Sequence, residues 1–173
     1  MIIDQVLEKN QEFLRDFKSE DLSHRPAKKL AIVTCMDTRL TDFLEPAMGL
    51  ERGDAKIIKN AGNRITDDAL RSLVVAVHSL GAEEIMVIGH TDCGMANVNF
   101  EKLRKAMEEN GVPRDFIEEL GLEDWIMAIE DEEKNVIEGV KTIKKFRAIP
   151  DDIPVHGLII DIRTGKLKVL HRD

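Results

Sequence analysis

The sequence contains no tyrosine, one tryptophan and two cysteines, and aromatic residues make up only 4% of its 173 residues. Its longest apolar run, at positions 73–77, is far shorter than the roughly 20 residues that a bilayer-spanning helix needs. Basic residues are not in excess either, because acids outnumber bases 33 to 25 for a net charge of -8. Nucleic acids and anionic membrane surfaces attract basic stripes. We therefore expect neither nucleic acid nor membrane as a partner.

A signal peptide begins with basic residues that are followed by a long apolar stretch. The first residues of this chain lack that pattern and carry acids instead. We therefore expect a cytoplasmic protein. A structural disulfide is not expected in that reducing compartment, so Cys35 and Cys93 are either small buried hydrophobes or thiolates with a chemical role. The length and the 43% hydrophobic composition predict one globular domain over residues 1–173.

Short apolar runs alternate with helical patterns along the chain. Buried strands are predicted at 29–35, 55–60 and 84–89, and a hairpin that turns at 163–165 is predicted within 155–170. Helices are predicted over 41–50, 66–80 and 95–146, the last interrupted near 111–113 and 121 and ending with a helix over 132–146. This alternation predicts an α/β domain with a mainly parallel sheet flanked by helices.

The first 18 residues form a separate pattern. Apolar residues recur at helical spacing over 2–18, which predicts an amphipathic helix that needs another surface to cover its apolar stripe. A polar segment with a proline, 19–28, follows as a loop.

The chemistry-bearing residues gather at the ends of two predicted strands. Cys35 ends the first strand, and His90 and Cys93 follow the third. The ligand crevice of an open α/β sheet lies at the carboxyl ends of its strands, so these residues converge there if the two strands are neighbours. Two thiolates and an imidazole suit zinc and leave a fourth position open. The alternative is a histidine packed beside two buried thiols, and both interpretations stay open on the residues alone.

The neighbouring residues also have two interpretations each. Asp37 and Arg39 are either a surface ion pair worth about 0–1 kcal/mol, or a pair in which Arg39 orients Asp37 to accept a hydrogen bond from metal-bound water. The loop 59–63 is either a simple turn or a substrate contact. We expect ordinary structural roles, without metal binding, for the other histidines: His24, His78, His156 and His171. The acidic run 130–133 is expected to be a solvated helix start, and Trp125 is expected to lie in the core or at an interface.

Three segments, in this order and spacing, resemble the motif blocks of the beta-class carbonic anhydrases. They are 35–39 (Cys-Met-Asp-Thr-Arg), 59–63 (Lys-Asn-Ala-Gly-Asn) and 90–94 (His-Thr-Asp-Cys-Gly). The short length and the ending 156–161 (His-Gly-Leu-Ile-Ile-Asp) are most similar to the compact branch known from methanogenic archaea.

The resemblance implies one zinc ion per chain, bound by Cys35, His90 and Cys93, with Asp37 and Arg39 as the catalytic pair beside it. It implies the reversible hydration of CO2 to bicarbonate and a proton by zinc-bound hydroxide, which is a lyase reaction. It also implies a four-stranded parallel core with an added C-terminal strand, and a homodimer whose subunits exchange the N-terminal helix, residues 1–18, and complete each other's cleft.

The chain departs from the family pattern in two places. Thr38 stands where the family commonly has serine, and the cleft tyrosine of the plant-like branch has no counterpart. The candidate cleft residues are Thr38, Lys56, Ala61, Gly62 and Gly94. Two other functions stay open: hydrolysis of carbonyl sulfide or carbon disulfide on the same zinc site, and a non-catalytic zinc or redox sensor in which Asp37 fills the fourth zinc position.

Overall fold

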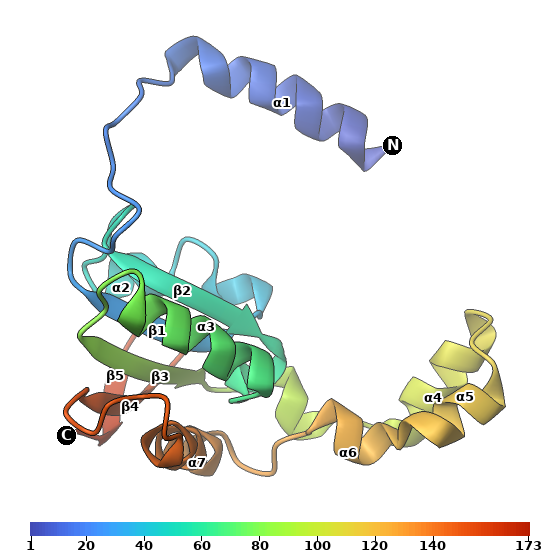
Figure 1. Ribbon diagram of the computed structural model, residues 1–173. Helices are drawn as coiled ribbons and strands as arrows, with labels where there is room; N and C mark the ends of the chain where they lie inside the picture. The colour runs from blue at the N-terminus through green and yellow to red at the C-terminus, as the bar shows by residue number, and fades with distance from the viewer.

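The computed structural model describes residues 1–173 and contains one five-stranded sheet (Figure 1). The strands in spatial order are β2 (Ala55–Asn60), β1 (Leu30–Cys35), β3 (Glu84–His90), β4 (Val155–Ile160) and β5 (Leu167–His171). The first four run parallel, and β5 pairs antiparallel with β4. The predicted four-stranded parallel core with an added C-terminal strand is confirmed.

The central strands are buried on both faces, which explains their nearly continuous apolar sequences. Every residue of β1 is buried. The helices are α2 (Leu44–Ala47), α3 (Asp67–His78), α4 (Phe100–Glu109), α5 (Arg114–Leu120), α6 (Leu122–Ile126) and α7 (Glu132–Lys145). Three 3-10 turns follow strand ends: η1 (Thr38–Leu40), η2 (Ala61–Asn63) and η3 (Gly94–Asn97). Helices α3 and α7 contribute to the core cluster on one face, and the second cluster, on the other face, includes both cysteines.

Helix boundaries follow local chemistry. The Thr66 hydroxyl accepts a hydrogen bond from the Ala69 N–H at 3.3 Å, as expected of an N-cap, and two aspartates occupy the first turn of α3. The helix predicted over 41–50 is shorter, because Asp42 has a φ of +53° that no α-helix accommodates.

Helix α7 packs closely against the sheet, and glycines lie at the points of contact. A Cβ at Gly89 would lie 2.8 Å from Val136 Cγ2, and a Cβ at Gly157 would lie 2.9 Å from Val136 Cγ1. From the helix side, a Cβ at Gly139 would lie 3.2 Å from Val87 Cγ1 on β3. Larger residues at these positions would hold the helix farther from β3 and β4.

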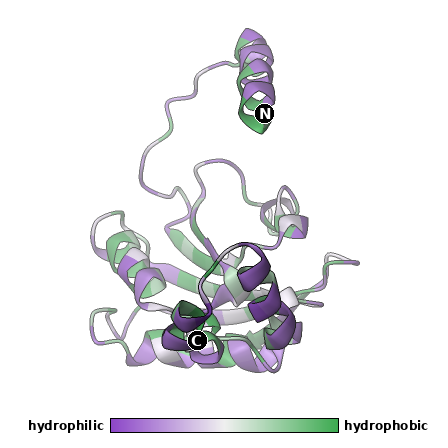
Figure 2. Cartoon of the chain, turned by 90° about the vertical axis from the view of Figure 1, so that its right-hand side faces the viewer, coloured by the Kyte–Doolittle hydropathy of each residue, from purple (hydrophilic) through white to green (hydrophobic).

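Helix α1 (Ile2–Asp16) stands apart from the sheet at the end of an extended segment (Figure 1). It has no buried residue, and its large apolar side chains are exposed. Figure 2 shows apolar and polar stretches alternating along this helix, which stands apart from the rest of the chain. Helices α4 and α5 also project from the sheet (Figure 1), and Trp125 in α6 is 62% exposed, which excludes the predicted core position for the tryptophan. No helix has both the length and the apolar content for a membrane crossing.

Candidate metal centre

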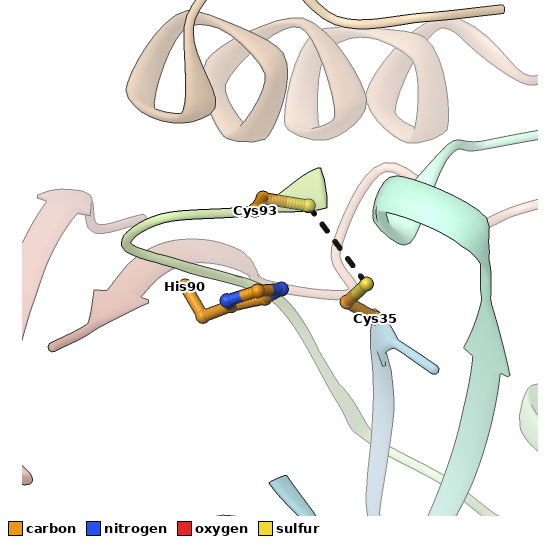
Figure 3. A group of neighbouring side chains, drawn as sticks. All are labelled: Cys35, His90 and Cys93. Carbon is orange, nitrogen blue, oxygen red and sulfur yellow. Dashed lines mark hydrogen bonds between the residues drawn. The ribbon is translucent and has the colours of Figure 1, made fainter. Parts of the chain in front are cut away.

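Cys35, His90 and Cys93 meet at the carboxyl edge of the sheet. Strands β1 and β3 are parallel neighbours, so Cys35 at the end of β1 and His90 at the end of β3 reach the same edge. Asp92 has a φ of +57° and turns the chain so that Cys93 returns toward Cys35. The two sulfurs lie 3.9 Å apart, and the three ligand atoms all lie within 4.8 Å of one another (Figure 3).

This geometry fits zinc. Two sulfurs at the usual Zn–S distance of about 2.3 Å in a tetrahedral arrangement lie about 3.8 Å apart, close to the separation seen here. His90 is fully buried, and its Nδ1 lies 2.9 Å from the Thr91 carbonyl oxygen, which places the ring proton on Nδ1. The other nitrogen, Nε2, is buried without a hydrogen-bond partner. A buried polar atom without a partner is costly, and a cation at the centre of the cluster would satisfy it.

The cluster already favours negative charge on sulfur. The hydrogen bond from the Cys93 thiol, aided by His90 and the backbone N–H of Gly62, lowers the pKa of Cys35 to about 4 despite burial. The pKa of Cys93 is raised, because its proton is shared with the Cys35 thiolate and because the thiol is buried. Burial lowers the pKa of His90, but the Cys35 thiolate and the Thr91 carbonyl outweigh it and the net shift is upward. A divalent cation would replace the shared proton.

Asp37 is locked beside the cluster by Arg39. The backbone N–H and Nε of Arg39 each donate to Asp37 Oδ1 at 2.9 Å, and one terminal nitrogen donates to Oδ2 at 2.7 Å. The guanidinium also donates to the Asp92 side chain at 2.9 Å and to its carbonyl oxygen at 2.8 Å. These hydrogen bonds from Arg39 lower the pKa of Asp37 to about 2. The carboxylate is therefore ionised and oriented, with Oδ2 at 3.8 Å from His90 Nε2.

An open cavity of about 400 Å³ adjoins the cluster. It is lined by Cys35, Met36, Asp37, Thr38, Arg39, Ala61, Cys93, Gly94 and Met95. The predicted cleft residues Thr38, Ala61 and Gly94 are among them, and the two methionines were not predicted. Gly62 lies behind Met95, since a Cβ there would lie 3.0 Å from the Met95 Cβ.

Lys56 does not reach the site. It is the second residue of β2 and pairs with Ala31 near the start of β1. Four residues separate it from the carboxyl end of its strand, which is about 13 Å along an extended chain. Its prediction as a cleft residue is therefore not supported by the structure.

One site contact comes from the acidic run 130–133, for which the sequence predicts a solvated helix start. Glu132 Oε1, in the first turn of α7, accepts a hydrogen bond from the Cys93 N–H at 3.3 Å. That interpretation is wrong for Glu132. Three of the remaining histidines make other contacts: His78 Nε2 lies 2.8 Å from the Ala148 carbonyl oxygen, His156 Nε2 lies 3.2 Å from Glu84, and His171 Nε2 lies 2.9 Å from Asp173.

Known proteins resemble the chain over nearly all of its length. The family profile described as carbonic anhydrase matches residues 30–167. Beta-carbonic anhydrase 1 of Mycobacterium tuberculosis is 32% identical over 167 residues, 96% of each chain. A carbon disulfide hydrolase of Acidithiobacillus thiooxidans is 32% identical over 157 residues, 83% of this chain and 78% of that protein.

The fold is similar to a solved structure as well. The crystal structure of beta-carbonic anhydrase isoform I (TvaCA1) from Trichomonas vaginalis has a TM-score of 0.94 and 36% identity, covering 98% of this chain and 97% of that chain. The range matched by the family profile contains every residue of the metal centre. The chain therefore belongs to the beta-carbonic anhydrase family.

Proposed function

We propose that this chain is a zinc-dependent carbonic anhydrase that interconverts CO2 and water with bicarbonate and a proton. The observation that carries the proposal is a cluster of three ligand atoms within 4.8 Å of one another, beside an apolar cleft. Zinc with three protein ligands keeps a fourth position open and lowers the pKa of water toward about 7, so that a hydroxide nucleophile is available near neutral pH. Structural zinc sites usually have four protein ligands, so a three-ligand set favours catalysis.

Asp37 would orient the attacking oxygen. An ionised carboxylate only accepts hydrogen bonds. Asp37 therefore favours a hydroxyl group, which can donate to it, over an unprotonated oxygen in the same position. It therefore distinguishes the hydroxyl of bicarbonate from its charged oxygens. Because Arg39 holds the pKa of Asp37 near 2, the carboxylate stays ionised in the neutral range and orients the proton rather than accepting it.

The cleft suits a small neutral substrate. Met36, Ala61 and Met95 contribute apolar surface to its lining, and Thr38 contributes a hydroxyl beside Asp37. CO2 is linear and uncharged, so it gains from apolar walls and needs no ion pair to bind.

Hydrolysis of carbon disulfide, or of carbonyl sulfide, is the second candidate. The similarity to a carbon disulfide hydrolase over 83% of this chain favours it, because these linear molecules suit the same three-ligand site. A non-catalytic sensor is less well supported, because Arg39 holds both oxygens of Asp37 and so opposes its use as a fourth ligand.

The deciding experiment is stopped-flow CO2 hydration on protein that holds one zinc ion per chain, with a chelated sample as the control. Fast hydration that the chelator abolishes supports the proposal. Turnover of carbon disulfide or carbonyl sulfide without CO2 hydration assigns the second candidate. The variant Asp37→Ala tests the orienting role: we expect zinc to be retained and the rate to fall about 10- to 100-fold, and an unchanged rate refutes that role.

We further propose a cytoplasmic homodimer of the compact branch, in which each subunit covers the other with its residues 1–18. The absence of any buried residue in α1 and the exposure of Ile3, Leu7 and Leu14 support this, because an isolated apolar stripe needs a partner surface. Light scattering of the full chain against a chain lacking residues 1–18 tests it. We expect a dimer for the first and a monomer with reduced hydration for the second, and equal masses would refute the exchange.

A further inference from the structure

Asn135 of α7 is a buried side chain that links two segments far apart in the sequence. It is 5% exposed. Its Oδ1 accepts a hydrogen bond from an Arg64 terminal nitrogen at 2.5 Å, and its Nδ2 donates to the Gly62 carbonyl oxygen at 2.8 Å. The orientation of the amide follows from chemistry, because a guanidinium only donates and a carbonyl oxygen only accepts.

Gly62 is the point at which this link reaches the metal centre. It lies in η2 with a φ of +72°, and its backbone N–H lies close enough to the Cys35 sulfur to help lower the pKa of that thiol. Its carbonyl group is thus held by Asn135 while its N–H group contacts a thiolate. The position favours glycine, since its φ is positive and a Cβ would also lie 3.0 Å from the Met95 Cβ.

The same helix contacts the second cysteine. Glu132 stands three residues before Asn135, so both side chains lie on one face of α7. The Glu132 carboxylate accepts the hydrogen bond from the Cys93 N–H at 3.3 Å. The close packing of α7 at Gly89 brings this face within reach of the strand ends that carry the ligands.

We propose that Asn135 is a positioning residue for the zinc centre: by holding the Gly62 carbonyl group, it keeps the Gly62 N–H directed at the Cys35 sulfur. An N–H group bonded to a thiolate withdraws electron density from the sulfur and fixes its direction, so it tunes the ligand before and after the metal binds. Arg64 assists by orienting the Asn135 amide. The inference rests on the proposed zinc site and assigns it a residue on α7.

The test uses two substitutions of Asn135 and a matched control. Asn135→Asp keeps an acceptor for Arg64 but turns a carboxylate oxygen toward the Gly62 carbonyl oxygen. Asn135→Leu removes both hydrogen bonds with a side chain of the same branched shape. Val140→Ala, in the same helix and 2% exposed, weakens core packing without touching η2. The readouts are zinc transfer to an excess of chromophoric chelator, the thiolate-to-metal absorption of the cobalt-substituted protein, and urea unfolding.

We expect both Asn135 variants to release zinc about 10-fold faster and to shift the cobalt band to longer wavelength. We expect Val140→Ala to match their loss of stability while keeping the wild-type release rate and spectrum. Wild-type release and spectra in the Asn135 variants overturn the inference, as does equally fast release from Val140→Ala.

Arg64→Met provides a second route if the Asn135 variants do not fold, because it leaves the buried amide in place and removes only its anchor. A shift in the same direction supports the inference, and wild-type release and spectrum overturn it. The proposed function fails separately, when the wild-type protein binds less than one zinc ion per chain or does not hydrate CO2.

Discussion

The contact between Gly89 and helix α7 predicts the effect of one added methyl group. In Gly89→Ala, the new Cβ would lie 2.8 Å from Val136 Cγ2 and 3.7 Å from the Glu132 carbonyl oxygen. Two carbon atoms pack best at about 3.5–4.0 Å, so the helix and the strand must separate by about 1 Å. Overpacking of a buried contact costs about 1–3 kcal/mol, and we expect about 2 kcal/mol here because Val136 is fully buried and both backbones are fixed by regular structure.

Urea unfolding measures this cost directly. Protein concentration must be fixed and zinc removed by a chelator, because both ligand and subunit association add to apparent stability. With a slope of about 2 kcal/mol per molar urea, a loss of 2 kcal/mol lowers the unfolding midpoint by about 1 M.

The substitution Val136→Ala provides the internal control. It removes the methyl group that the new Cβ of Gly89→Ala would meet, so the double variant should be more stable than the sum of the two single losses predicts, by about 1 kcal/mol or more. A wild-type midpoint for Gly89→Ala, or strictly additive losses, would refute the argument that this glycine sets the distance between α7 and the sheet.

Two further predictions concern single charged groups. Asp173 accepts hydrogen bonds from Lys144, the Val155 N–H and His171, and the first of these contributes most to a pKa held well below its usual range. Asp173→Asn should therefore cost about 1–2 kcal/mol in urea unfolding at pH 6. The difference should shrink as the pH falls below about 4, the usual carboxyl pKa, and vanish only below the lowered folded-state pKa, because the hydrogen bonds stabilise the ionised form. A difference that is as large at pH 2 as at pH 6 contradicts this. Arg39→Gln should keep one zinc ion per chain and lower CO2 hydration about 10-fold, and an unchanged rate contradicts the positioning of Asp37 by Arg39.

The sheet and the cluster of Cys35, His90 and Cys93 were predictable because both depend on local patterns. Parallel strands buried on both faces have short, continuous apolar sequences, and such a sheet places its chemistry at the carboxyl ends of its strands. Cys35 and His90 each end a strand, so one assumption about strand order was enough to bring them together. The structure satisfies that assumption, since β1 and β3 are neighbours.

The contacts around the ligands were not predictable, because they join residues far apart in the chain. Glu132 and Cys93 are 39 residues apart, and Asn135 and Gly62 are 73 residues apart. The helix dipole already explains an acidic residue such as Glu132 at a helix start. Nothing in the sequence indicates that Glu132 also accepts a hydrogen bond from the Cys93 N–H. The prediction of Lys56 as a cleft residue has the opposite fault. Lys56 is close in sequence to the loop 59–63, but its position near the start of β2 places it far from the carboxyl edge of the sheet.

Helix α7 thus joins the stability of the fold to the geometry of the metal centre. Its distance from the sheet depends on Gly89, and two side chains of its first turns hold the backbone groups beside the ligand cysteines. The substitution Gly89→Ala should therefore change two quantities, the unfolding midpoint and the rate of zinc release, whereas Val140→Ala should change only the first. If Gly89→Ala lowers stability and leaves zinc release unchanged, the helix packs against the sheet without positioning the metal centre. That result would refute the positioning roles of Glu132 and Asn135.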